Sequence, residues 1–308
     1  MKIKTRIIGI IVFGITCLFV ASFIASQELN KANREYSAQE SIIAHSSAWT
    51  SNMDIEFKDK LLVYDPTVGA YENTLFWEHS AVDPFERGDN SNPLFDALES
   101  KNGDAVTDLM SSIFANDLES EQLTFAVAYD NRGLQLYCES GPYVIGVDPC
   151  SESASPDYFL NFRAFAKSLQ NSSTRKVVTI KDLDEREPIS INDTLSFALT
   201  DDGGEVSGIV VLGRNITENL EDFTENFELE AALVVGKEVI TIGDYYEEER
   251  SEKLNSLIRD SLKYAGDNQA FEYSYINNEL QMRSSSIPLS NSIRASDLRI
   301  LFFDDQSE

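Results

Sequence analysis

The stretch that decides the fold is FAVAYDNRGLQLYCES, which runs from residue 125 to residue 140. The flanking segments Leu123–Tyr129 and Leu134–Glu139 have the composition and the two-residue period of β-strands. Between them, Asp130-Asn131-Arg132-Gly133 places a glycine where a tight turn needs a positive φ. The stretch therefore predicts a β-hairpin.

A helix and three further strands are predicted after this hairpin. A polar loop, residues 140–156, leads to the helix Asp157–Leu169, whose first carboxylate favours the helix dipole. The predicted strands are Arg175–Ile180, Thr194–Thr200 and Val206–Leu212, the last two joined through the turn at residues 201–204. Hairpin, helix and three antiparallel strands make one α+β unit.

The same order of elements returns towards the C-terminus. A helix, Asn215–Phe227, joins the two units. The second unit is expected to contain the strands Leu229–Val235 and Glu238–Ile242, the helix Tyr246–Tyr264, and the strands Phe271–Ile276, Leu280–Pro288 and Leu298–Phe303. The repeat is one of architecture and not of sequence letters.

A long helix is predicted ahead of both units. From Ser26 to about Leu62 the chain has neither Pro nor Gly, and apolar side chains recur at spacings of three and four. They are Leu29, Ala32 and Tyr36, then Trp49, Met53, Phe57 and Leu61. This seam fits a partner helix, although its later part could pack on the domain behind it. The helix should end at Asp65-Pro66, because the residue before proline resists the α region. Short helices should follow around Leu75–His79, Leu94–Glu99 and Ala105–Phe114.

Residues 1–25 are predicted to be a cytoplasmic tip and an uncleaved transmembrane signal anchor. Three cations (Lys2, Lys4 and Arg6) precede the apolar run Ile7–Ala25. A helix over this run would be about 28 Å long, close to the thickness of a bilayer core. The positive-inside rule then puts residues 26–308 outside the cytoplasm. A cleaved signal peptide is the first alternative, although Phe23 suits a cleavage site poorly, and lipidation at Cys17 is the second.

The composition excludes several functions. Asp and Glu number 52 against 25 Lys and Arg, so the 308-residue chain has a net charge of −27. Nucleic acid is not expected as a partner, because phosphate binding needs clustered cations. With only two histidines and three cysteines, neither a metal nor a cofactor is predicted. The length suits about two domains.

No catalytic motif occurs in the sequence. Gly-x-Ser-x-Gly, the phosphate-loop signature and His-Glu-x-x-His are all missing. Glu78-His79 lacks a second histidine, and both His45 and His79 are expected to be ordinary polar residues, since a catalytic histidine needs an orienting partner. The chain is therefore predicted not to be an enzyme and to have no catalytic residues.

Two cysteines outside the anchor are expected to pair. Cys138 and Cys150 would lie in an oxidising compartment, where a disulfide closing this short loop is worth about 3 kcal/mol. Two separate buried thiols are the alternative.

These features together resemble the double Cache extracytoplasmic sensor domains of bacterial transmembrane receptors, which carry two PAS-like modules in tandem. The segments that carry the resemblance are FAVAYDNRGLQLYCES (125–140), GGEVSGIVVLGRNITENLED (203–222), ELEAALVVGKEVITIG (228–243) and LRILFFDDQSE (298–308). The resemblance implies a stalk helix over residues 26–64 and a membrane-distal module over 65–214. It also implies a connecting helix and membrane-proximal module over 215–308.

Two departures from the family are visible. The closing strand of the family runs into a second transmembrane helix, whereas no apolar run follows Phe303. We expect the chain to be a fragment cut before that helix, with a single-pass variant as the alternative. The Arg-x-Trp-Tyr core of the amino-acid-binding subgroup is also missing, because Arg163 stands in LNFRAFAK. An amino-acid ligand is therefore not implied.

The face between the first sheet and the loop after its hairpin is the predicted ligand-binding site. The candidates are Tyr137 on the strand, Tyr143 and Asp148 in the loop, and Tyr158 and Arg163 on the following helix. Tyrosine offers a flat face, and arginine offers a fixed fork of donors for a carboxylate. Ordinary packing and surface pairing are the alternative interpretation of these residues.

The predicted function is that of a ligand-sensing input domain in the plasma membrane, with a histidine kinase, diguanylate cyclase or chemotaxis output elsewhere. The expected partners are a small molecule or a periplasmic protein, and a second copy of the chain through the stalk helix. An anchored envelope protein that binds another protein without signalling is the first alternative. A secreted hydrolase, which would need convergent acids in one cleft, is a weaker one.

Overall fold

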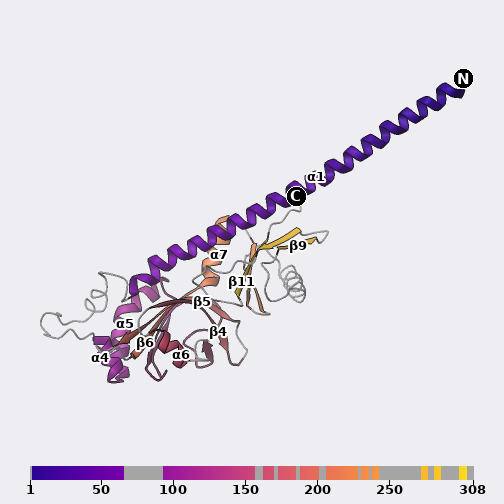
Figure 1. Cartoon of the computed structure of the whole chain (residues 1–308). Coiled ribbons are helices and arrows are strands. Elements are labelled where there is room, and N and C mark those ends of the chain that lie inside the picture. The colour runs from indigo at the N-terminus through magenta and orange to yellow at the C-terminus, as the bar shows by residue number, and fades with distance from the viewer. Residues whose placement is uncertain are drawn as a thin grey trace.

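The computed structural model describes residues 2–65, 93–156, 162–169, 173–184, 188–200, 206–227, 230–235, 238–242, 272–276, 281–285 and 298–303. It is an α+β protein with antiparallel sheets and one long N-terminal helix (Figure 1). This agrees with the class that the sequence predicts. The predicted helices at residues 75–79 and 246–264 lie outside the described residues.

Helix α1 (Lys2–Glu56) is continuous, and its N-terminal part projects away from the rest of the molecule (Figure 1). A π-helical turn, η1 (Phe57–Leu61), and a 3₁₀ turn, η2 (Leu62–Tyr64), complete it, and Asp65 then has extended backbone, with φ −71° and ψ 112°. The helix thus ends where Pro66 was expected to end it.

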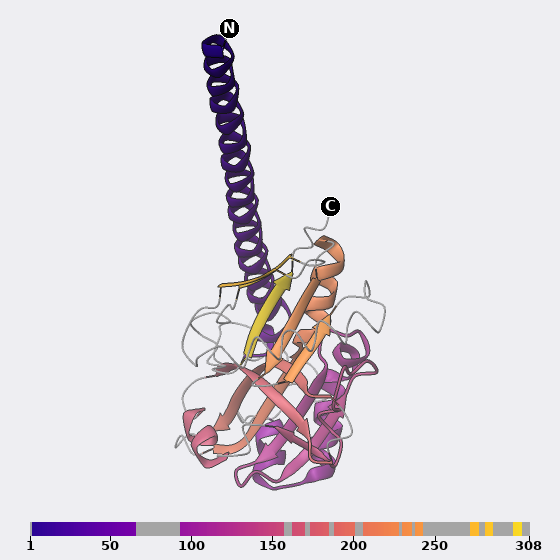
Figure 2. The ribbon, with the colours of Figure 1, turned by 90° about the vertical axis from the view of Figure 1, so that its right-hand side faces the viewer.

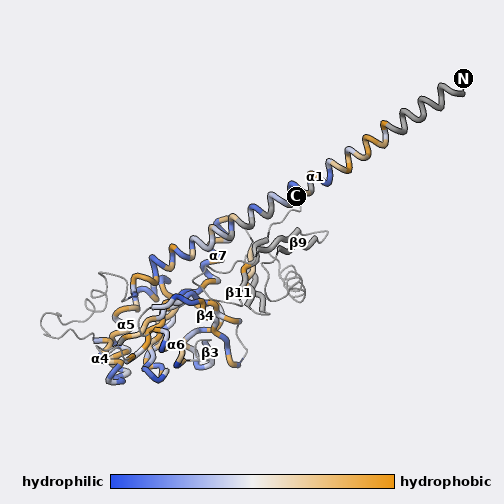
Figure 3. The backbone as a smooth tube through the Cα atoms, in the orientation of Figure 1, coloured by the Kyte–Doolittle hydropathy of each residue, from blue (hydrophilic) through white to orange (hydrophobic). Residues whose placement is uncertain are grey.

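The projecting part of α1 is hydrophobic on the described turns nearest the N-terminus (Figure 3). Its large apolar side chains between Ile15 and Ile24 are each more than half exposed. The side chains of residues 1–14 lie outside the described part of the chain. Within that part, no helix combines the length and the apolar character needed to cross a bilayer.

The apolar seam of α1 divides into two parts. Its later members, Trp49, Met53, Phe57 and Leu61, are all buried, whereas Leu29 and Tyr36 are 63% and 64% exposed. The later part therefore packs on the chain's own domain, which was one of the two interpretations of the pattern. The earlier part has no such cover within the described residues.

The first sheet contains six antiparallel strands in the order β2-β1-β6-β5-β4-β3. Its strands are β1 (Phe125–Asp130), β2 (Gln135–Ser140), β3 (Ala154–Pro156), β4 (Thr174–Asp182), β5 (Ser190–Thr200) and β6 (Val206–Asn215). The hairpin turn is held by Asp130 Oδ1, which accepts hydrogen bonds from the backbone N–H groups of Arg132 and Leu134 at 2.8 Å. Gly133 has φ +88° there, as the turn required. The short strand β3 was not predicted.

Helices cover both faces of this sheet. Helices α4 (Pro93–Glu99) and α5 (Gly103–Glu119) pack on one face, where their apolar side chains join a core with Ala126, Ala128 and Tyr137. Helix α6 (Phe162–Ser168) packs on the other, near Val127 and Tyr129. The predicted helix began at Asp157, and residues 157–161 lie outside the described part. Because both faces are covered, every residue of β1 is buried.

The second group of strands lies between the first sheet and the projecting part of α1 (Figures 1 and 2). Helix α7 (Ile216–Phe227) follows β6 directly and leads to this second group. The second group contains the strands β7 (Glu230–Val235), β8 (Glu238–Ile242), β9 (Glu272–Ile276), β10 (Gln281–Ser285) and β11 (Leu298–Phe303). The hydrogen-bonded orders are β11-β7-β8 and β10-β9, and β10 also contacts β11.

Candidate functional site

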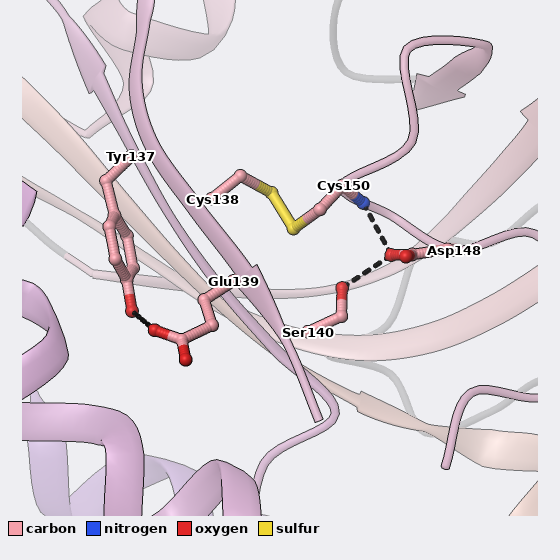
Figure 4. The surroundings of a disulfide bond; sticks show 6 residues. All are labelled: Tyr137, Cys138, Glu139, Ser140, Asp148 and Cys150. Carbon is pink, nitrogen blue, oxygen red and sulfur yellow. Dashed lines mark hydrogen bonds between the residues drawn. A yellow bond between two sulfur atoms is a disulfide. The ribbon is translucent and has the colours of Figure 1, made fainter. Parts of the chain in front are cut away.

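The two faces of strand β2 determine which predicted site residues can meet. In the register of the hairpin, Tyr137 lies opposite Ala128, and Cys138 lies opposite Val127. Side chains alternate across a strand, so Tyr137 points to α5 while Cys138 points to the opposite face (Figure 4). Tyr137 is therefore not brought together with the loop and α6, where the other candidates lie.

The surroundings of Tyr137 are those of a packed tyrosine. It is 5% exposed, and its hydroxyl donates a 2.5 Å hydrogen bond to Glu139 Oε2 (Figure 4). The hydroxyl of Ser111 on α5 donates to the same oxygen at 3.3 Å. Burial, and then the bond to Glu139, raise the pKa of Tyr137 above its ordinary value of 10.0. The phenol is thus a neutral donor at physiological pH.

The loop after the hairpin is fixed to the sheet at several points. A disulfide joins Cys138 and Cys150, the pairing that the sequence favoured. Asp148 Oδ1 accepts hydrogen bonds from Ser140 Oγ at 2.6 Å and from the backbone N–H of Cys150 at 2.8 Å (Figure 4). Asn215 Nδ2 donates to the backbone oxygen of Ile145 at 2.9 Å. One oxygen of Asp148 is therefore occupied in shaping the loop.

Among the described members of the predicted set, Arg163 and Tyr143 are the exposed ones. Arg163 is exposed on α6, whose neighbouring Phe162 packs edge-on against Tyr129. Tyr143 is 66% exposed in the loop. Tyr158 lies outside the described residues. The structure thus brings Asp148 and Arg163 to one face of the sheet, with Tyr143 in the loop that borders it.

A second polar site, which was not predicted from the sequence, lies where α1 meets the first sheet. Arg175 on β4 directs its Nε and Nη2 at both oxygens of Asp193 on β5, at 2.7 to 3.1 Å. Its Nη1 lies 2.5 Å from Asp54 Oδ1 of α1, and its Nη2 donates to the backbone oxygen of Met53 at 3.3 Å. The guanidinium also lies 4.2 Å above the ring centre of Phe57. One side chain therefore joins β4, β5 and α1.

A neighbouring ion pair adds β6 and α7 to this junction. Arg214 at the end of β6 pairs with Glu56 of α1. Asn219 of α7 donates from its Nδ2 to the same Glu56 oxygen at 2.6 Å. A cavity of about 10 Å³ lies among these three side chains, with Asp193 also at its wall. We call this group of Arg175, Asp193, Asp54, Arg214, Glu56 and Asn219 the junction cluster.

Burial sets the electrostatics of the junction cluster. It raises the pKa of Asp193 from 3.8 to about 6, although the hydrogen bonds from Arg175 act in the opposite direction. Burial also disfavours the charged form of Arg214 and so lowers its pKa, whereas the nearby carboxylates of Glu218 and Asp222 act to raise it. The sequence gives little signal for this cluster, because Arg175 and Asp193 stand among other polar residues in TRKVVTIKD (174–182) and SINDTLSFALT (190–200). No group of three or more His, Cys, Asp or Glu side chains in the described ranges could hold a metal ion.

Comparison with known proteins gives structural similarity only. No protein-family model and no curated protein matches the sequence. The periplasmic domain of Vibrio cholerae LuxQ is 11% identical with a TM-score of 0.48, over 86% of this chain and 100% of that one. The ligand-binding domain of the Pseudomonas fluorescens chemoreceptor CtaA, in complex with L-isoleucine, is 12% identical with a TM-score of 0.43, over 84% and 89%. The sensory domain of the Campylobacter jejuni chemoreceptor Tlp3, with isoleucine bound, is 15% identical with a TM-score of 0.36, over 84% and 96%. The chain is similar to these periplasmic and sensory domains.

Proposed function

We propose that the chain is an extracytoplasmic, ligand-sensing input domain of a bacterial transmembrane receptor, with a binding and not a catalytic role. The observation that carries the proposal is the repeated strand order. In the first sheet, the strand order β2-β1-β6-β5-β4 places the hairpin, β1 and β2, beside β6, which is the last of these strands in the chain. In the second group, the hairpin strands β8 and β7 likewise lie beside the last strand, β11, and β10 and β9 follow. Two such sheets in series fit two PAS-like modules.

The division of the chain follows from this repeat. The proposed membrane-distal module covers residues 65–214, and the connecting helix with the membrane-proximal module covers 215–308. Helix α7 starts at Ile216, one residue after β6 ends. A change in the first sheet would thus be passed to the second group of strands through α7.

The proposed ligand site is the loop-covered face of the first sheet. Arg163, Tyr143 and Tyr158 are the proposed contacts, with Asp148 shaping the loop. The exposed guanidinium of Arg163 suits a small polar molecule that carries a carboxylate, and the tyrosines offer flat faces for its apolar part. Tyr137 is better explained by its packing against α5 and its bond to Glu139.

Helix α1 is proposed to anchor the protein in the membrane and to bind the same helix of a second copy of the chain. The apolar run at residues 7–25 supports an anchor with the N-terminus in the cytoplasm. The exposed Leu29 and Tyr36 lie seven residues apart on α1, which is the spacing of a helix–helix seam. We propose that a second copy of the chain covers them.

A ligand screen on the purified full chain tests the proposal. Amino acids, organic acids, polyamines and nucleobases are added singly, and the melting temperature is measured. A ligand that binds the folded state raises the melting temperature with concentration. The Arg163→Ala variant should lose that response, while Lys167→Ala, a control at another exposed position of α6, should keep it. No shift with any compound would favour an envelope protein that binds another protein.

A further inference from the structure

Four buried side-chain atoms lack a hydrogen-bond partner within the described part of the chain, and two of them belong to the junction cluster. They are Trp49 Nε1 on α1, Asn192 Oδ1 on β5, Arg214 Nε on β6 and Asn219 Oδ1 on α7. Folded proteins satisfy nearly all buried polar atoms, with water if no protein group is available. The two such atoms in the junction cluster, Arg214 Nε and Asn219 Oδ1, therefore call for a specific partner.

The two residues that carry these atoms line the same cavity. Arg214 and Asn219 are 8% and 3% exposed, and both border the cavity of about 10 Å³ beside Glu56. We propose that this cavity binds one internal water molecule, which accepts a hydrogen bond from Arg214 Nε and donates one to Asn219 Oδ1. A cavity of this size has room for about one water.

The chemistry of the two atoms selects water over an ion. The Nε of arginine can only donate, and an amide oxygen can only accept. A halide could accept from Arg214 but could not donate to Asn219. An ammonium or metal cation could satisfy Asn219 but would be repelled by the guanidinium. Water does both, and Glu56 and Asp193, two further residues that border the cavity, offer acceptors for its second proton.

The orientation of the Asn219 amide is fixed by its other contact. Nδ2 donates to Glu56 Oε2 at 2.6 Å, and the same oxygen is paired with Arg214. An amide turned by 180° would place Oδ1 against the carboxylate, with two acceptors facing each other. The amide oxygen therefore faces the cavity and needs a donor there.

A bridging water would give the junction a particular mechanical property. It links the last strand of the first sheet to α7, directly beside Glu56 of α1. Water-mediated hydrogen bonds can be remade when the flanking groups shift, at little enthalpic loss. The contact between α1 and α7 can thus change its geometry without leaving buried charges unpaired. The water site itself does not depend on the proposed sensor role.

The test is a count of long-lived waters on the full chain by magnetic relaxation dispersion, together with a crystal structure that shows ordered water. Asn219→Leu replaces the amide with an apolar group of similar size, and we expect it to lose one long-lived water per molecule. Asn226→Leu is the matched control, because Asn226 is exposed on the same helix, and it should keep the wild-type count. The wild-type crystal structure should show a water within hydrogen-bond distance of Arg214 Nε and Asn219 Oδ1.

Two results would overturn the proposal. One is an equal count of long-lived waters in the wild type and Asn219→Leu. The other is a wild-type crystal structure in which the cavity is empty or Arg214 Nε bonds directly to a protein acceptor. If Asn219→Leu does not fold, Asn219→Ser replaces it. The smaller side chain should enlarge the cavity and add a water, and a wild-type count in that variant would also contradict the proposal.

Discussion

Arg175 Nη1 lies 2.5 Å from Asp54 Oδ1, so that a residue of β4 holds a residue of α1 that is 121 positions away in the sequence. The same guanidinium is forked onto Asp193 of β5 and stacked on Phe57 of α1. The end of the long helix is thereby tied to the middle of the first sheet.

Removal of the Arg175 cation should destabilise the protein strongly. Arg175→Met leaves Asp193 buried without its partner, which for buried ion pairs costs about 3–5 kcal/mol in the free energy of unfolding. Chemical denaturation of the full chain measures this change. Lys181→Met, at an exposed position on the same strand, should change the stability by about 0.5 kcal/mol or less. Equal stability of the two variants would show that Arg175 contributes little, whereas Arg175→Met combined with Asp193→Leu should recover much of the loss.

The raised pKa of Asp193 should appear as a pH dependence of stability. Its folded pKa of about 6 exceeds the ordinary 3.8, so between these values the folded state binds the proton more tightly. The stabilisation of the folded state by proton binding at Asp193 is fully present below pH 3.8 and is lost as pH rises through about 6. The measurement compares the unfolding free energies of wild type and Asp193→Asn, because the contributions of the other carboxylates cancel in the difference. From pH 7 to pH 4 this difference should grow in favour of wild type by up to about 3 kcal/mol. A flat difference would mean that Arg175 keeps Asp193 ionised throughout.

Loss of the Cys138–Cys150 disulfide should cost about 3 kcal/mol, because it releases the unfolded chain from a short closed loop. Cys138→Ser combined with Cys150→Ser should therefore lower the denaturation midpoint, and reductant should lower that of the wild type equally. Cys17→Ser is the control, since Cys17 is a free, exposed thiol and should have no effect. A reductant response in the double variant would point to another cause.

Glycine is required at position 213 but not at position 103. Gly213 lies opposite Phe125 in the β1–β6 register, and an added Cβ would collide with the fully buried ring of Phe125. Gly213→Ala should cost about 1–3 kcal/mol. A Cβ on Gly103 meets nothing within 4 Å, so Gly103→Ala at the start of α5 should be neutral or slightly stabilising. Calorimetry compares the two, and Phe125→Leu should reduce the cost of Gly213→Ala if the ring is the obstacle.

The sequence predicts only in part which of the candidate residues share one face of the sheet, as Tyr137 illustrates. Alternation along a strand states that Tyr137 and Cys138 point to opposite faces, but it does not state which face the following loop will cover. The disulfide settles this, since it draws the loop to the side of Cys138. Tyr137 then falls under α5, a helix that precedes the hairpin in the chain.

The sequence by itself determined local elements: the hairpin about Gly133, the end of the long helix at Asp65-Pro66, and the order of the described strands and helices apart from β3. These follow from periodicity, turn chemistry and proline sterics, which act between residues a few positions apart. Only the tertiary structure decided that Asp54 and Glu56 of α1 meet Arg175 and Arg214 of the sheet. The pairing of buried charges depends on which distant surfaces come together and exclude water, and no spacing along the chain encodes it.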